Sequence, residues 1–252
     1  MIDLSNQVAV ITGGSRGVGA ATAVLLAQAG ADIAIMHRHN SSSVGETLDE
    51  IRRFGRTSKA FKGAVEDSDH CSDMVDRIRN EFGKIDILVN CAGIWESGRI
   101  GGMTYRNWQK TIDINLTGTF NACNAVIPLM KRRKYGRIIN VSSTAGQRGE
   151  PYHSHYAASK GGIIAFTKSI AAEVIRDGIW VNCVAPGWVQ TDMIADVLRN
   201  RTQKKRIIET IPRGKIALPS EIAGVILFLS SQFADNIVGE VINVNGGSVL
   251  CG

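Results

Sequence analysis

The sequence predicts an α/β fold, in which a parallel, doubly wound sheet of about seven strands carries helices on both faces. Two observations point to this fold. Short apolar, β-rich runs alternate with longer helical patterns along the 252 residues, as in repeated βαβ units with right-handed crossovers. The runs 85–89 and 180–184 are also mostly apolar without strict alternation, as expected of parallel strands that are covered on both faces.

Strands are predicted where a short apolar run is bounded by turn residues. They cover residues 7–12, 32–37, 59–62, 85–90, 137–142, 179–185 and 240–244. The predicted helices cover residues 17–29, 43–54, 67–82, 105–113, 116–133, 155–177 and 219–230. Pro219 fits the first position of the last helix, and Glu221 fits its first turn. Residues 188–216 break the rhythm after a strand end, where an open sheet places its ligand crevice, so we expect a substrate-covering loop with short helices there.

The composition favours one globular domain over residues 1–252. The chain has no Pro/Ser-rich linker, no low-complexity segment and no apolar run of membrane-spanning length. Its five cysteines are scattered and lack C-x-x-C spacing, and no secretory signal is visible at the start. These features argue against disulfides and a zinc site, and for a cytoplasmic location.

The net charge of +6 raises the question of an acidic partner. The densest basic runs are 131–134 and 204–206, and neither is interleaved with aromatic residues that could stack on bases. We therefore interpret them first as solvated helix faces and second as contacts for an acidic small molecule or protein. Nucleic-acid binding has no support beyond the overall charge.

A glycine-rich turn follows the first predicted strand and opens the first helix. Its candidate cofactor-binding residues are Gly13, Ser15, Arg16, Gly17, Val18 and Gly19. At such a turn, backbone N–H groups and the helix dipole face a phosphate, and glycines allow close approach. The spacing G-x-x-x-G-x-G differs from the G-x-G-x-x-G fingerprint, but its place at the first βα turn predicts a dinucleotide site.

The end of the second strand predicts which dinucleotide binds. An NAD site usually has an acidic residue there to hold the adenosine ribose, whereas residues 35–40 contain no carboxylate and include Arg38. Arg16 lies inside the glycine turn. Two guanidiniums near the ribose favour a 2′-phosphate, so we expect NADP(H). The alternative is that Arg38 is a plain surface residue.

Tyr156 and Lys160 stand four residues apart on a predicted helix and therefore share a face. A free phenol has a pKa of about 10, too high for easy proton exchange near neutral pH. A neighbouring cation favours the phenolate and lowers the pKa toward the working range. The same spacing also describes a solvated helix face, so other residues must decide between the two interpretations.

Together, the glycine turn and the Tyr156/Lys160 pair resemble the short-chain dehydrogenase/reductase family over essentially the whole chain. Further motifs match in order: Asn90, Ala92 and Gly93 after the fourth strand, Asn115 in a helix, Ser143 thirteen residues before Tyr156, the segment with Pro186, Gly187, Val189 and Thr191, and Asn245 to Gly247. The resemblance implies a single-domain Rossmann fold. It assigns cofactor binding to the glycine turn, to Arg38, to the motifs at 90–93 and 186–191, and to Tyr156 and Lys160.

Two positions depart from the family pattern. Cys91 occupies the second position of the family's N-N-A-G motif, a small substitution that should be tolerated. Ala64 stands where many members place an Asp that holds the adenine, so adenine binding would rely on backbone groups or on Val65.

The resemblance implies catalytic roles for four residues. Tyr156 would exchange a proton with the substrate oxygen, and Lys160 would lower the pKa of that phenol and bind the nicotinamide ribose. Ser143 would stabilise the charge that develops on the substrate oxygen. Asn115 would hold a water beside Lys160 for a proton relay. No metal is expected.

The sequence leaves the substrate open. The pattern most resembles the 3-oxoacyl-[acyl-carrier-protein] reductase branch, whose acidic carrier protein could meet the basic run 131–134. Asp177, however, stands where carrier-docking members tend to have an arginine. A sugar, polyol or small-ketone reductase therefore remains an alternative, and a non-catalytic NADP-binding sensor is a third.

Five residues are candidates to line the substrate pocket: Trp95, His153, His155, Trp188 and Met193. The two histidines could instead be plain surface residues. Since family members are mostly tetramers, the resemblance also implies a homotetramer, paired through the helices 116–133 and 155–177 and the C-terminal strand.

Overall fold

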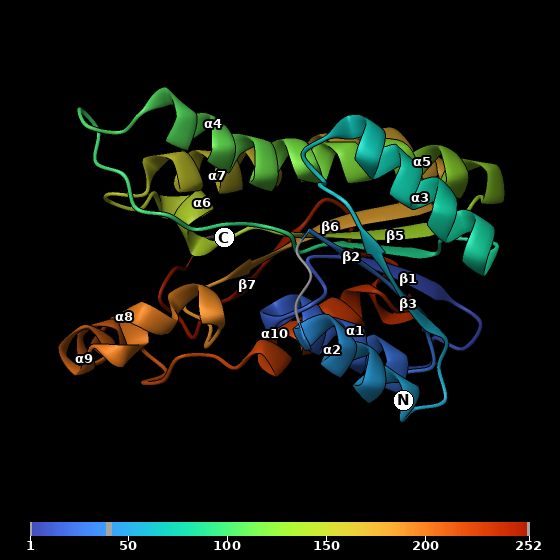
Figure 1. The fold of residues 1–252 in the computed structure, drawn as a ribbon, viewed down its shortest axis with the longest axis horizontal. Helices are drawn as coiled ribbons and strands as arrows, with labels where there is room; N and C mark the ends of the chain where they lie inside the picture. Colours follow the sequence, from blue (N-terminus) through green and yellow to red (C-terminus); the bar gives the residue numbers. More distant parts are fainter. Residues whose placement is uncertain (1, 39–41, 251–252) are drawn as a thin grey trace.

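The computed structural model describes residues 2–38 and 42–250, and its centre is a seven-stranded sheet (Figure 1). The strands are β1 (Val8–Thr12), β2 (Asp32–His37), β3 (Ser58–Lys62), β4 (Ile87–Asn90), β5 (Gly136–Val141), β6 (Ile179–Pro186) and β7 (Val241–Val244). They lie in the order β3-β2-β1-β4-β5-β6-β7, and each neighbouring pair is parallel. The predicted doubly wound parallel sheet is confirmed.

Helices cover both faces of this sheet, as Figure 1 shows. One layer contains α3 (Ser68–Phe82), α4 (Tyr105–Ile112), α5 (Gly118–Arg133) and α7 (Ser154–Val174). The opposite layer contains α1 (Gly17–Gln28), α2 (Ser42–Arg52) and α10 (Pro219–Leu229). Among the described residues, no helix is long and apolar enough to cross a bilayer.

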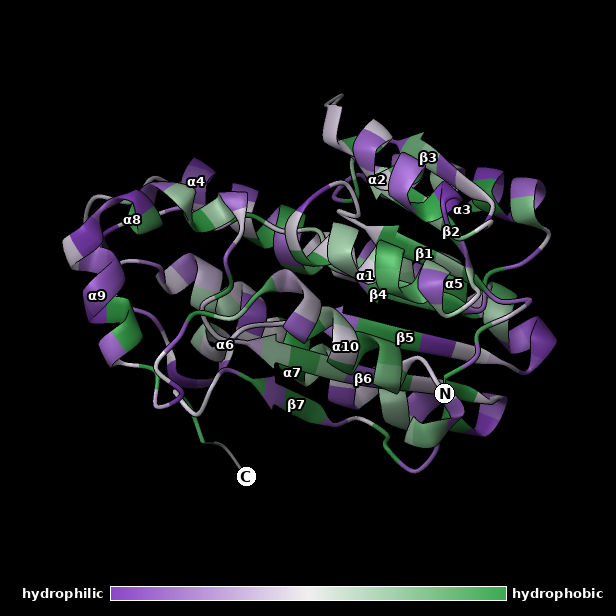
Figure 2. Cartoon of the chain, turned by 90° about the horizontal axis from the view of Figure 1, so that it is seen from below, coloured by the Kyte–Doolittle hydropathy of each residue, from purple (hydrophilic) through white to green (hydrophobic). Residues whose placement is uncertain are grey.

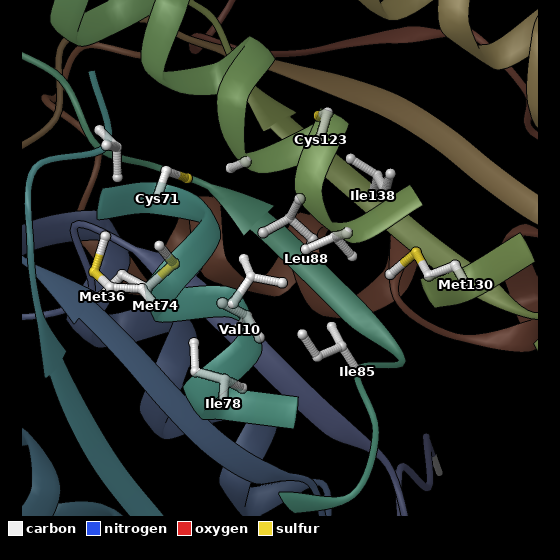
Figure 3. Packing of buried hydrophobic residues seen from close by; sticks show 14 of the residues in the cluster. Val10, Met36, Cys71, Met74, Ile78, Ile85, Leu88, Cys123, Met130 and Ile138 are labelled. Carbon is white, nitrogen blue, oxygen red and sulfur yellow. The ribbon is translucent and has the colours of Figure 1, made fainter. Parts of the chain in front are cut away.

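Two hydrophobic cores lie on the two faces of the sheet because neighbouring residues of a strand point to opposite faces. Val10 contributes to the core under α3 and α5, and Ile11 to the core over α1 and α10. Figure 3 shows the first core, in which Leu88 of β4 lies between the side chains of Met74 and Met130. Burial on both faces explains why the strands are apolar without alternation, and Figure 2 shows these strands as mostly hydrophobic.

The predicted helices 105–113 and 116–133 form one continuous helical run. A π-helical turn, Asp113–Thr117, joins α4 to α5, and its widened hydrogen bond runs from the Gly118 N–H to the Asp113 carbonyl. Such single wide turns often occur at functional sites. Sequence periodicity does not reveal the turn, which places Asn115 in the interior with no exposed surface.

Between β6 and α10, residues 188–216 contain two short α-helices, α8 (Ala195–Arg199) and α9 (Arg201–Glu209), after a 3-10 turn, Asp192–Ile194. None of the residues of α8 or α9 is buried. In Figure 1 these helices project beyond the carboxyl end of β6. A further short helix, α6 (Thr144–Arg148), follows β5 and has Ser143 as its N-cap.

Candidate functional site

Most of the predicted functional residues lie at or just after the carboxyl ends of β1, β4, β5 and β6, which meet at one edge of the sheet. The register places Thr12 beside Asn90, Asn90 beside Asn140, and Val141 beside Val184. Residues far apart in the sequence therefore lie together there. This edge is where an open α/β sheet binds its ligand.

The glycine turn after β1 is too tight for side chains at two of its glycines. Gly13 has a φ of +66°, and a Cβ there would stand 2.8 Å from the Cα of Ala92. A Cβ on Gly19 would collide with the carbonyl oxygen of Gly13. Arg16 is the N-cap of α1, and among the described residues no side chain caps this helix end. The turn thus has the backbone shape and the free helix terminus of a phosphate cradle.

The segment after β6 reaches this turn. Gly17 has a φ of +56°, and a Cβ on it would lie 3.1 Å from the Cγ2 of Thr191. The segment is held at its start by the Gly187 N–H, which donates to the Val244 carbonyl at 3.1 Å. Further along, the Gln190 N–H donates to the Ala217 carbonyl at 2.8 Å. Pro186 and Val189 of the same motif are buried.

The expected adenosine end lies beside β2 and β3. Arg38 forms an ion pair with Glu66, and about half of the Arg38 side chain is exposed. The two residues border a hollow of about 470 Å³ that is otherwise lined by residues of α4 and the π-helical turn. Arg38 is therefore held in place by a partner that the sequence did not indicate. Val65 is buried, and its carbonyl accepts a hydrogen bond from Asn121 Nδ2 at 2.9 Å.

The motif after β4 is tied to the sheet. Asn90 is buried, and its Nδ2 donates to Asn140 Oδ1 at 2.9 Å and to Cys123 Sγ at 3.3 Å. The Thr12 hydroxyl accepts from the backbone N–H groups of Cys91 and Ala92, each at 3.1 Å. The Asn90 side chain is thus committed to the core, which leaves its backbone as the part that can face a cofactor.

Asn115 locks three segments together from inside the π-helical turn. Its Oδ1 accepts from the Ile94 N–H at 2.8 Å, and its Nδ2 donates to the Ile94 carbonyl and to Ser159 Oγ, each at 3.0 Å. A Cβ on Gly93 would lie 3.2 Å from Asn115 Oδ1 and 3.6 Å from Lys160 Nζ. Asn115 and Lys160 therefore flank the same glycine. This bracing role of the side chain was not predicted from the sequence.

Lys160 projects from α7 into the interior beside the end of β5. Its Nζ donates to the Val141 carbonyl at 2.8 Å, and the residue is only 5% exposed. The Ser142 hydroxyl donates to the Lys160 carbonyl at 2.7 Å, which fixes this part of the helix. Burial lowers the pKa of Lys160 to about 8. The ammonium is thus destabilised but still the main form at neutral pH.

Tyr156 and Ser143 meet at the mouth of this site. Burial raises the pKa of the Tyr156 phenol to about 12, and a hydrogen bond with the Ser143 side chain acts in the opposite direction. Lys160 Nζ lies 5.8 Å from the centroid of the Tyr156 ring. Lys160 thus lies beside the Tyr156 ring, whereas burial sets the direction in which the phenol pKa moves. The expected lowering of the Tyr156 pKa is therefore not found in the protein alone.

Three of the five candidate pocket residues form an aromatic cluster, which we define as Trp95, His153 and Trp188. The Trp95 ring stacks on His153 with centroids 4.3 Å apart and meets the edge of Trp188 at 6.0 Å. Met193 is exposed, whereas His155 has no exposed surface. The interpretation of His155 as a surface residue is therefore wrong. Its position on the inner face of α7 explains the difference.

The basic run 131–134 is partly paired within the chain, since three of its four cations meet two carboxylates. Lys131 and Lys134 each lie 3.0 Å from an Asp177 oxygen, and Arg133 binds the buried Asp86 at 2.7 Å. This pairing weakens the expectation that the run meets an acidic carrier protein. Asp177 itself occupies the position at which an arginine was expected for docking a carrier protein. Within residues 2–38 and 42–250, no group of three His, Cys, Asp or Glu residues could hold a metal ion.

Comparisons with known proteins show which family the chain resembles over its length. A family model described as enoyl-(acyl carrier protein) reductase matches residues 13–248. The chain is 38% identical over 251 residues to a 3-oxoacyl-[acyl-carrier-protein] reductase from Synechocystis, covering 99% of this chain and all of that protein. It is 37% identical over 242 residues to the corresponding reductase of Staphylococcus aureus, covering 96% of this chain and 98% of that protein.

Solved structures show the same likeness in three dimensions. A protein from Sinorhizobium meliloti described as a short-chain alcohol dehydrogenase superposes with a TM-score of 0.94 at 34% identity, over 98% of both chains. The seven-stranded parallel sheet in the order β3-β2-β1-β4-β5-β6-β7 agrees with this structural likeness. The chain belongs to the short-chain dehydrogenase/reductase family of oxidoreductases.

Proposed function

We propose that this oxidoreductase transfers a hydride between NADP(H) and a carbonyl or secondary-alcohol substrate, and that its substrates are 3-oxoacyl groups carried on an acyl carrier protein. The observation that carries the proposal is the meeting of Ser143, Tyr156 and Lys160 beside Gly93 and the glycine turn. The names of the Synechocystis and Staphylococcus relatives support this substrate class. We further propose a cytoplasmic homotetramer, as the family resemblance implies.

The residues present fit a phosphorylated dinucleotide. The uncapped start of α1 and the tight turn at Gly13 suit a pyrophosphate, and Arg16 and Arg38 would hold the 2′-phosphate. Lys160 would bind the nicotinamide ribose. When bound, the nicotinamide supplies the hydride, while the protein positions and polarises the substrate.

Ser143 and Tyr156 would act on the substrate oxygen. The Ser143 hydroxyl would donate a hydrogen bond to that oxygen, and the Tyr156 phenol would give it a proton during reduction or take one during oxidation. Burial raises the pKa of Tyr156 to about 12, so the phenol is protonated at neutral pH in the protein alone. The Lys160 cation would bring this pKa toward the working range so that the proton can leave. Asn115 would hold a water beside Lys160 to resupply the proton.

A sugar, polyol or small ketone is the alternative substrate class. It is favoured by Asp177, which stands at the place of a docking arginine and pairs with Lys131 and Lys134 of the basic run 131–134. A non-catalytic sensor is less well supported, because it would have no need for Ser143, Tyr156 and Lys160 together.

A cofactor-oxidation screen tests the proposal. NADPH and NADH would each be offered with acetoacetyl thioesters, diketones and ketoses, and the loss of reduced-cofactor absorbance recorded. We expect turnover with NADPH and the highest kcat/KM with a thioester. Turnover of ketoses alone would select the alternative class, and no turnover with any carbonyl compound would contradict the proposed activity.

A further inference from the structure

Glu66 is a largely buried carboxylate at the expected adenosine end of the cofactor site. It lies in the turn between β3 and α3, and only 18% of its side chain is exposed. It forms an ion pair with Arg38, which directly follows β2. A carboxylate with so little access to water needs a partner, and the guanidinium supplies one. The pair therefore joins the ends of two neighbouring strands.

The backbone on both sides of Glu66 is fixed by hydrogen bonds. Before it, the carbonyl of the buried Val65 accepts from Asn121 Nδ2 at 2.9 Å. After it, Asp67 is the N-cap of α3, and its Oδ1 accepts from two backbone N–H groups of the first turn, each at 3.0 Å. The Glu66 carboxylate is thus carried on an anchored turn, whereas about half of the Arg38 side chain is exposed.

Glu66 and Arg38 both border the hollow of about 470 Å³ beside α4. Of the described residues that line this hollow, two carry a carboxylate, Glu66 and Asp113. Asp113 Oδ1 accepts a hydrogen bond from Gln109 Nε2 at 2.7 Å, which holds it within its own helical run. Glu66 is therefore the lining carboxylate that occupies the guanidinium expected to bind the cofactor.

We propose that Glu66 is a specificity-determining residue, which competes with the 2′-phosphate of NADP(H) for the Arg38 guanidinium and so narrows the preference for NADP(H) over NAD(H). The proposal rests on the proposed function, in which Arg38 binds that phosphate. A phosphate held by Arg38 has the Glu66 carboxylate as a neighbour, and two anions on one cation repel each other. NAD(H) has an uncharged hydroxyl at the same position, so Glu66 opposes the phosphorylated cofactor alone.

Binding of the adenosine end alone tests this role without turnover. Adenosine 2′,5′-bisphosphate and AMP differ only in the 2′-phosphate, and calorimetric titration measures both affinities. Glu66→Gln removes the charge but keeps an oxygen that can accept from the Arg38 guanidinium. In this variant we expect the bisphosphate to bind about tenfold more tightly and the AMP affinity to stay within about twofold. Glu66→Asp retains the charge, so its ratio of the two affinities should stay near that of the wild-type protein.

Glu81→Gln is the matched control, because Glu81 of α3 pairs with Lys59 of β3 at 2.5 Å and does not line the hollow. It should leave both affinities in place. A gain in affinity is also a result that mere damage to the fold does not produce. Unchanged or weaker binding of the bisphosphate in Glu66→Gln, or an equal gain in Glu81→Gln, would overturn the competition. The expected gain without turnover of any carbonyl compound would instead contradict the proposed activity and leave the role of Glu66 intact.

Discussion

At the scale of single residues, the site depends on which groups burial leaves charged. Lys160 and Tyr156 are both moved toward their neutral forms, the lysine by a lowered pKa and the tyrosine by a raised one. The thiol of Cys91, next to both, is protonated for the same reason. Lys160 is thus the cation expected to meet a bound dinucleotide, and Tyr156 is expected to enter the reaction as an acid.

Cys91 should be a poorly reactive thiol. Burial raises its pKa to about 11, so the nucleophilic thiolate is scarce at neutral pH. Labelling with iodoacetamide, followed by peptide mass spectrometry, should modify Cys91 much more slowly than the same peptide in the unfolded protein. Labelling at equal rates in the two states would contradict the protonated, half-buried thiol.

Arg38 should determine the preference for the phosphorylated cofactor. Loss of a charge-assisted phosphate contact costs about 1.5–3 kcal/mol, so Arg38→Asp should weaken NADPH binding by roughly tenfold to a hundredfold. NADH binding should be unchanged or tighter. Fluorescence titration measures both affinities, and Arg52→Asp, at an exposed arginine of α2, is the control. An unchanged ratio of the NADPH and NADH affinities would show that Arg38 does not bind the 2′-phosphate.

At the scale of elements, the glycine-rich turn after β1 and the π-helical turn have different roles. The start of α1 provides backbone N–H donors. It packs so closely on Gly13 that a side chain at Gly19 would not fit. The π-helical turn buries Asn115, which then braces the segment after β4 against α7. Both turns depend on their backbone geometry and on close packing against a neighbouring element.

A methyl group at Gly19 should disrupt the cofactor turn. The Cβ in Gly19→Ala would collide with the Gly13 carbonyl, so we expect a lower melting temperature and at least about tenfold weaker NADPH binding. Gly45→Ala in α2 is the matched control, because nothing lies within 4 Å of its Cβ. That variant should be neutral or stabilised by about 0.4–1 kcal/mol. Equal behaviour of the two variants would contradict the tight turn.

At the scale of the whole molecule, the doubly wound parallel sheet and most element bounds could be predicted from the sequence. The βαβ rhythm and the apolar strands are local signals, and they located all seven strands. The partners of charged groups could not be predicted. Arg38 with Glu66, and Glu150 with Trp95, pair residues that lie 28 and 55 positions apart (66 − 38 and 150 − 95). Only the folded chain brings such residues together.

Stability should fall in mild acid because of His155. Burial and the neighbouring His153 lower its pKa from the ordinary value of 6.5, so the unfolded chain takes up a proton before the folded protein does. The free energy of unfolding should therefore decrease as the pH falls below about 6.5, and this loss should level off below the folded-state pKa. Urea unfolding between about pH 5 and about pH 8 measures the slope. His155→Gln should flatten it, and an unchanged slope would contradict the buried neutral imidazole.

The central claim is that Tyr156 exchanges a proton with the substrate beside a bound NADP(H). The most direct measurement compares the wild-type protein with Tyr156→Phe, using NADPH and an acetoacetyl thioester for turnover and fluorescence titration for NADPH binding. General acid catalysis contributes about a hundredfold to ten-thousandfold, so turnover should fall by that factor while the NADPH affinity stays within about threefold. Turnover close to the wild-type rate in Tyr156→Phe would contradict the claim.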